Sequence, residues 1–133
     1  MRGPLASVVV LLGALGCAGP AGQPVGSVSC QPFGYTPAPI AFSFAPGSVD
    51  ASRAEETAVA LYRACHGSAG TVSNLTSSTS SATGSFGGPN AGQSVWQVQV
   101  SATVTDPSGA TYQSHYWIEV NQSTGVPTLI AYG

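Results

Sequence analysis

The chain has 133 residues, of which three are arginine, none is lysine and five are acidic, so its formal net charge is −2. This length fits one small domain. Three cations leave no basic stripe that could neutralise phosphates, so we expect no nucleic-acid partner. Because disordered chains combine weak hydrophobicity with strong charge, a composition of 43% hydrophobic and 6% charged residues indicates a folded chain.

The first sixteen residues have the pattern of a secretory signal peptide. One cation, Arg2, precedes an apolar run over residues 5–15, and small residues follow. A helix that spans a bilayer needs roughly 20 apolar residues, and this run is shorter. We therefore predict that residues 1–16 direct export and are removed.

The end of this run, Ala14-Leu15-Gly16-Cys17, resembles the lipobox of bacterial lipoproteins. Gly16 and Cys17 fit the motif, whereas Ala14 stands where leucine is usual. The resemblance implies that Cys17 becomes the mature N-terminus, carries lipid, and anchors the protein to the outer face of a membrane. The alternative is free secretion after cleavage within residues 18–22.

Three cysteines leave one without a partner in a secreted chain unless Cys17 has another use. Once Cys17 is lipidated, Cys30 and Cys65 remain, and we predict a disulfide between them in an oxidising compartment. The alternative, a metal site built from Cys65 and His66, lacks the spaced ligand pairs that zinc requires. We therefore expect no metal and no cofactor.

The exported part divides into a tether and a domain. Residues 17–38 are rich in glycine, proline and serine, which predicts a lipidated cysteine followed by a tether. Phe33 and Tyr35 are large apolar residues within it, and we expect them to cover one edge of the core. The small folded domain is predicted over residues 39–133.

A strand and a helix open the predicted domain. Large apolar residues alternate with small ones over residues 40–45, which is the period of a strand. Ser52 and Glu55 form a capping box, which predicts a helix over residues 53–65. The apolar stripe of this helix holds Ala54, Ala58, Leu61, Tyr62 and Cys65. Most charges of the exported part lie on or just before this helix and are interpreted as its solvated face.

The stretch that follows the helix is dominated by serine, threonine and glycine. Residues 71–79 predict a weak edge strand. Residues 80–92 are interpreted as a mobile loop, because no lysine or helix start accompanies their glycines as a phosphate-binding loop would require.

Two half-buried strands follow, because apolar and polar residues alternate over residues 96–104 and 112–120. The intervening Asp-Pro-Ser-Gly at residues 106–109 predicts a type I turn with a bulge. The resulting register pairs Val104 with Tyr112, Val100 with Tyr116, Val98 with Ile118 and Trp96 with Val120.

The same reasoning at residues 122–125 predicts a further antiparallel strand. Its register pairs Val120 with Thr128, Ile118 with Ile130, Trp117 with Ala131 and Tyr116 with Tyr132. The expected fold class is α+β, with one helix packed on an antiparallel sheet of about four to five strands, in two layers and the order β-α-β-β-β-β.

This order, with Trp96 opening a valine-rich strand and Ser-Thr-Gly at residues 123–125, resembles PepSY-like domains and more broadly the cystatin-like arrangement. The resemblance covers residues 50–132 and implies a module that modulates peptidases. Asn121 stands near the turn where PepSY domains usually carry an acid. The cystatin hairpin motif is absent, so inhibition of cysteine peptidases is not implied.

His115, Trp117 and Glu119 share the outer face of one strand, and the predicted register places Leu129 diagonal to Trp117. We predict a contact face of these four residues that binds an envelope protein or a peptidase. Ser101 is expected opposite His115, but a Ser-His-Glu site on a flat exposed sheet would not exclude water. We therefore expect no enzymatic activity.

The predicted function is that of an exported, membrane-anchored, non-enzymatic binding or peptidase-modulating module at the cell envelope. The alternative is a small-molecule carrier with a pocket between helix and sheet. Trp96, Tyr112 and Tyr116 would then line a cavity rather than fill the space. A cavity larger than roughly 300 Å³ would favour the carrier.

Overall fold

The computed structural model describes residues 25–66 and 70–133. The predicted signal peptide and Cys17 lie outside the described residues. In chain order the elements are β1 (Val25–Ser29), β2 (Pro39–Ser43), α1 (Ala51–His66), β3 (Thr71–Thr83), β4 (Ser94–Thr105), β5 (Thr111–Asn121) and β6 (Pro127–Tyr132). Within the described ranges, no helix has the length and apolar character needed to cross a membrane.

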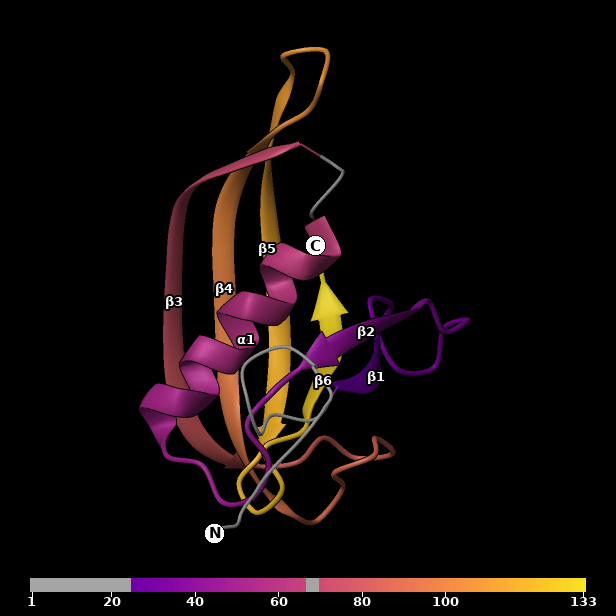
Figure 1. Ribbon diagram of the computed structural model, residues 1–133, viewed down its shortest axis with the longest axis vertical. Helices are drawn as coiled ribbons and strands as arrows, with labels where there is room; N and C mark the ends of the chain where they lie inside the picture. Colours follow the sequence, from indigo (N-terminus) through magenta and orange to yellow (C-terminus); the bar gives the residue numbers. More distant parts are fainter. Residues whose placement is uncertain (1–24, 67–69) are drawn as a thin grey trace, which may run out of the picture.

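The strands form two sheets. β3, β4, β5 and β6 make a four-stranded antiparallel sheet in chain order, and α1 crosses one face of it diagonally (Figure 1). β1 and β2 pair with each other in a separate two-stranded sheet. The predicted α+β class is confirmed, although the strand predicted at residues 40–45 lies in the small sheet as β2.

The helix begins with an aspartate cap. The Asp50 Oδ1 atom accepts a hydrogen bond from the backbone N–H of Arg53 at 2.8 Å. This bond satisfies one of the backbone donors that a helix start leaves free, so Asp50 is the cap and the predicted Ser52 is not. The helix spans Ala51–His66 instead of residues 53–65.

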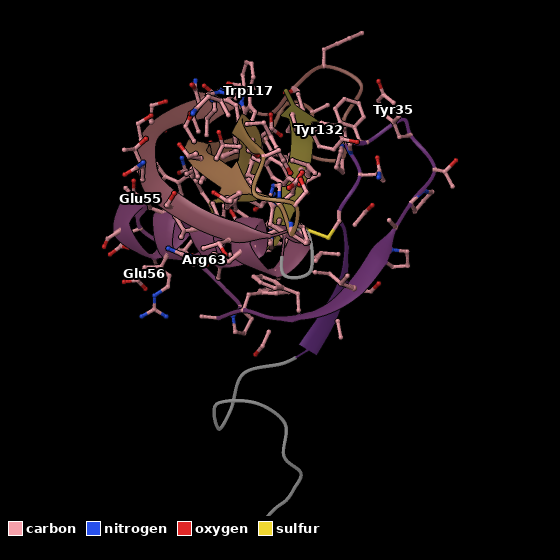
Figure 2. All side chains as sticks on the ribbon, turned by 90° about the horizontal axis from the view of Figure 1, so that it is seen from above. Tyr35, Glu55, Glu56, Arg63, Trp117 and Tyr132 are labelled. Carbon is pink, nitrogen blue, oxygen red and sulfur yellow. A yellow bond between two sulfur atoms is a disulfide. The ribbon has the colours of Figure 1, made fainter. Side chains whose placement is uncertain are left out.

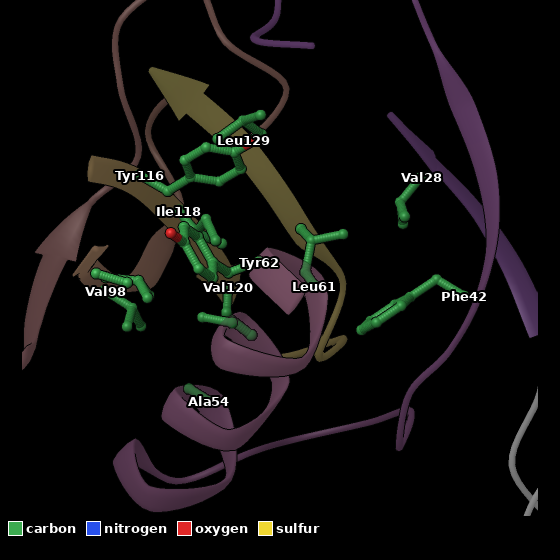
Figure 3. Close-up of a cluster of buried hydrophobic side chains, with 13 residues drawn as sticks. Val28, Phe42, Ala54, Leu61, Tyr62, Val98, Tyr116, Ile118, Val120 and Leu129 are labelled. Atoms are coloured by element: carbon green, nitrogen blue, oxygen red, sulfur yellow. The ribbon is translucent and has the colours of Figure 1, made fainter. Parts of the chain in front are cut away.

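The core lies between α1 and the inner face of the main sheet. Figure 3 shows Leu61 and Tyr62 of α1 close to Ile118 and Val120 of β5, and all four are fully buried. The tyrosine ring meets the ring of Tyr116 edge-on, with 4.9 Å between centroids. The predicted helix stripe is confirmed, with its alanines fully buried and Cys65 half-buried.

The β4–β5 hairpin has the predicted register at every predicted pair, from Val104 opposite Tyr112 to Trp96 opposite Val120. At the turn, the backbone N–H of Asp106 donates to the carbonyl of Ala110 at 2.8 Å. Turn chemistry and apolar alternation therefore specify the same pairing.

The β5–β6 register agrees with the prediction on one side of a β-bulge and departs from it by one residue on the other. The confirmed pairs are Tyr116 with Tyr132 and Trp117 with Ala131, whereas Ile118 lies opposite Leu129 and Val120 opposite Pro127, in place of Ile130 and Thr128. The slip starts at the turn, where the Asn121 N–H donates to the Val126 carbonyl at 3.0 Å. Asn121, rather than Gln122, therefore faces Val126, and the bulge absorbs the difference.

The prediction of a tether over residues 17–38 is wrong from Val25 onward, because this part of the chain belongs to the fold. Val28 of β1 is buried in the core cluster. The backbone N–H of Phe33 donates to the Leu129 carbonyl at 3.3 Å and so covers the free edge of β6. Tyr35, expected to do the same, is 68% exposed.

The predicted disulfide is present. Cys30, just after β1, is bonded to Cys65 near the end of α1, with 5.5 Å between their Cα atoms. The bond links the small sheet to α1, the helix that packs on the main sheet. It also removes Cys65 from the alternative metal site with His66.

β3 extends four residues beyond its predicted end, so residues 80–83 are strand rather than loop. The connection to β4 is residues 84–93, and it closes with a hydrogen bond from the Gly84 N–H to the Gln93 carbonyl at 2.8 Å. The interpretation of residues 80–92 as a mobile loop is therefore corrected to a strand end followed by a hydrogen-bonded connection.

Candidate functional site

The four residues of the predicted contact face do not share one surface. His115 is exposed, and Trp117 is 36% exposed. Figure 2 shows Trp117 on the side of the sheet away from the labelled residues of α1. Glu119 is 0% exposed and Leu129 only 2%. His115 and Trp117 therefore remain in the predicted contact face. Glu119 and Leu129 do not belong to it, and the reasons differ.

Leu129 is on the opposite face of the sheet from Trp117. The one-residue slip beyond the β-bulge places it across from Ile118, whose side chain belongs to the core. Side chains alternate between faces along a strand, so a slip of one residue moves each of them to the other face.

Glu119 faces outward as predicted, but residues 84–93 cover it. One carboxylate oxygen accepts hydrogen bonds from the Ser85 N–H at 2.8 Å and from the Ser85 hydroxyl, and the other accepts from Asn90 Nδ2 at 3.4 Å. The Asn121 side-chain amide continues the network to Asn90 Oδ1 at 3.1 Å and to Gln93 Oε1 at 2.7 Å. A buried carboxylate needs such partners, so Glu119 serves to clamp the connection onto the sheet.

Gly84 explains how the connection comes so close. A Cβ atom at this position would lie 2.0 Å from the Asn90 carbonyl oxygen. Only glycine permits this approach, which brings Asn90 over the outer face of the sheet.

Trp117 is a large apolar residue on the uncovered part of this face and is partly exposed. It lies between Gln99 of β4 and Ala131 of β6. The polar side chains around and beyond it on the same face are Gln99, Ser101, Thr103, Gln113 and His115, and none of them is a carboxylate, a lysine or an arginine. Exposed aromatic area on a surface depleted in charge is typical of the centre of a protein–protein interface.

Ser101 lies opposite His115 as predicted, and the Ser101 hydroxyl shares a 2.6 Å hydrogen bond with His115 Nδ1. Glu119 does not complete a catalytic arrangement with this pair, because its oxygens bind Ser85 and Asn90. The pair is exposed, so water reaches it freely. This geometry lacks the oriented acid and the enclosed site that nucleophilic catalysis uses.

A concave surface lies beside β6. An open groove of about 280 Å³ is bounded by residues 31–37 on one side and by Val126 and Leu129 on the other. Phe33 and Tyr35 form part of its walls. The groove lies at the sheet edge, away from the space between α1 and the sheet where a carrier would need its pocket.

Sequence reasoning missed a buried polar cluster at the end of α1. His66 is 8% exposed, its ring centroid is 4.5 Å from that of Tyr62, and its Nε2 atom lies 3.2 Å from the Ser114 hydroxyl. Burial lowers the pKa of His66, and burial raises the pKa of the neighbouring Tyr116 to about 12. Both groups are therefore neutral at pH 7 and pack as part of the core.

Comparison of the chain with protein-family models, curated proteins and solved structures finds no match.

Proposed function

We propose that this protein is an exported, membrane-anchored binding module that docks a protein of the cell envelope through the outer sheet face around Trp117. One observation carries the proposal. A tryptophan is 36% exposed in the middle of β5, on the face that α1 does not cover (Figure 2). Tryptophan is enriched among the few residues that dominate interface energies.

The surroundings of Trp117 favour binding because they are already ordered. Its strand, β5, is paired on both sides, and Trp117 itself lies opposite Gln99 of β4 and Ala131 of β6. Two residues further along β5, Glu119 clamps residues 84–93 against the same face. A surface that needs no reordering loses less conformational entropy when a partner binds.

Export is supported by the Cys30–Cys65 disulfide, since such bonds persist in oxidising compartments. Anchoring rests on the lipobox-like residues before Cys17 and is tested by Cys17→Ser. We expect this variant to move from the membrane fraction to the soluble fraction of the native host. A mature N-terminus beyond Cys17, or an unchanged membrane fraction, would reject the anchor.

A binding module accounts for the structure better than the alternative carrier. The space between α1 and the sheet is filled by fully buried side chains, among them Leu61, Tyr62 and Ile118. The resemblance to PepSY-like domains favours a peptidase as the docked partner.

The test is recovery of a partner from native envelope extract with wild-type protein, Trp117→Ala and Tyr35→Ala. Tyr35 is a matched control because it is also an exposed aromatic residue, 68% accessible, but lies outside this face. We expect Trp117→Ala alone to lose the partner, with its melting temperature close to that of the wild type.

A large fall in the melting temperature of Trp117→Ala with the partner retained would overturn the proposal, because Trp117 would then act in packing. Mass spectrometry of the recovered partner identifies its class. If it is a peptidase, its activity with and without the domain shows whether binding modulates it.

A further inference from the structure

β3 presents a free sheet edge. It is the terminal strand of the main sheet, and within the described residues only β4 pairs with it. Over residues 76–83 its register with β4 is unbroken, and this stretch contains no proline and no charged residue. Proteins commonly use proline, lysine or bulges to block such an edge against pairing with another chain. In β3, the bulge lies outside this stretch, between Ser73 and Thr76.

The register shows which backbone groups face outward. The Gly84 N–H points toward β4, since it donates to the Gln93 carbonyl at 2.8 Å. Backbone groups in an antiparallel ladder alternate in direction from one residue to the next. The residues that direct their N–H and C=O groups away from β4 are therefore Ser77, Thr79, Ser81 and Thr83.

A groove runs beside this edge. It has a volume of about 540 Å³ and lies between α1 and Ser77 of β3. Glu55, Glu56, Val59 and Arg63 line it from one stripe of the helix. Figure 2 labels the three charged residues, which belong to α1. In a chain with only eight charged side chains, three of them therefore border the free edge.

Glu55 holds a fixed position at the edge. Its Oε2 atom accepts a hydrogen bond from the Ser77 hydroxyl at 2.7 Å. The Ser77 side chain therefore projects to the α1 side of the sheet, while its backbone groups face the free edge. A residue of an added strand directly opposite Ser77 would project to the same side and meet the Glu55 carboxylate.

We propose that the β3 edge binds an extended segment of a partner protein by strand addition, with a lysine or arginine of that segment opposite Ser77. The backbone supplies the hydrogen bonds, and the groove selects the side chains. The cation pairs with Glu55, and residues two positions away lie along the apolar part of the groove at Val59. This surface is separate from the Trp117 face, so the inference does not depend on the proposed function.

A second copy of this chain fits the edge less well. The chain has no lysine, and β3 itself carries no charged residue. Pairing between two β3 strands would therefore place no lysine or arginine of the added strand opposite Ser77. A segment of a different protein can supply that residue.

The test uses isotope-labelled protein and a nine-residue synthetic peptide of alternating threonine and valine with one central lysine. The matched probe has glutamate in place of that lysine. We expect the lysine peptide to shift the amide resonances of Ser77, Thr79, Ser81 and Thr83 and to slow their hydrogen exchange. The amides between them already bond to β4 and should change little. The glutamate peptide should bind about tenfold more weakly, because attraction is replaced by repulsion at a surface pair.

Three variants separate the contribution of the β3 backbone to peptide binding from the contribution of the Glu55 charge. Ser81→Pro removes an outward N–H while keeping the ladder with β4, and we expect it to abolish peptide binding. Ser81→Ala is its control, because it removes only the hydroxyl that accepts from Gln122 Nε2. Glu55→Gln should retain binding but lose most of the preference for lysine, and this variant decides the question if Ser81→Pro fails to fold.

Several results would overturn the inference. They are unchanged outward amides at millimolar peptide, equal binding of the two peptides, and full binding by folded Ser81→Pro. Concentration-dependent shifts of the same amides without peptide would also overturn it, since the occupant would then be a second copy.

Discussion

Ser85 and Glu119 are 34 residues apart in the sequence, yet the Ser85 backbone N–H donates to the Glu119 carboxylate at 2.8 Å. The Ser85 hydroxyl binds the same oxygen. The carboxylate thereby fixes the connection between β3 and β4 against the outer face of β5.

Replacing Glu119 by alanine should release this connection. The Ser85 N–H and the Asn90 amide would lose their acceptor, so we expect the free energy of unfolding to fall by about 1–3 kcal/mol. Urea denaturation measures the loss, and faster amide exchange at Ser85 locates it. As control, Glu56→Ala removes only an exposed ion pair with Arg53 at 3.4 Å and should cost less than about 1 kcal/mol. Equal losses in the two variants would contradict the assigned role of Glu119.

The assignment of the helix cap predicts different effects at two neighbouring positions. Asp50→Ala removes the side-chain acceptor of the Arg53 N–H and should lower the free energy of unfolding by roughly 0.5–2 kcal/mol. Ser52→Ala should change it by less than about 0.5 kcal/mol. Thermal melts of both variants show which substitution costs more stability. A larger loss of stability in Ser52→Ala than in Asp50→Ala would identify Ser52 as the cap, as the sequence predicts.

Removing the disulfide should destabilise the domain strongly. The Cys30–Cys65 bond closes a loop with a sequence separation of 35, for which the loop-entropy model gives roughly 3–4 kcal/mol. The double variant Cys30→Ser, Cys65→Ser is compared with the oxidised wild type by urea denaturation. A loss below about 1 kcal/mol would show that the bond does not restrict the unfolded chain as expected.

His66 should make stability depend on pH below neutrality. Burial lowers its pKa in the folded state from the ordinary value of 6.5, so the unfolded state takes up the proton first as the pH falls. The free energy of unfolding is therefore highest above pH 6.5 and decreases as the pH falls below it. His66→Gln should flatten this decrease below pH 6.5, whereas His115→Gln, at an exposed site, should retain it. The same pH dependence in all three proteins would exclude His66 as its source.

The two hairpins show how far sequence patterns determine a register. In β4–β5, the turn at residues 106–109 and the apolar alternation independently favour one pairing. In β5–β6, Leu129 and Ile130 are both aliphatic, so the apolar pattern accepts either register. The deciding residue is Asn121, whose Oδ1 atom accepts from the backbone N–H of Ser123 at 2.9 Å. Asparagine commonly starts a turn, so Asn121 could have indicated this register from the sequence. It places the start of the turn at residue 121 instead of the predicted residue 122.

The burial of Glu119 could not be predicted from such patterns. Alternation correctly predicts that it faces away from α1, but residues 84–93 cover it through contacts with no periodicity. β1 was missed for a different reason. Its five residues include one glycine and two serines, which have weak strand propensity, and it forms by pairing with β2.

The position of the disulfide determines how a mechanical load on the N-terminal side of the domain would be carried. Pulling there first peels β1 from β2, which frees five residues, or about 17 Å of extended chain at roughly 3.4 Å per residue. The load then reaches Cys30 and passes through the disulfide to Cys65, at the end of a helix whose Leu61 and Tyr62 are fully buried. β2 and the segment around Phe33 lie inside the closed loop and are bypassed. A domain held to a surface from this side would therefore resist extension through its core helix, whereas the groove beside β6 would lose the wall that Ser27, Val28 and Ser29 of β1 supply.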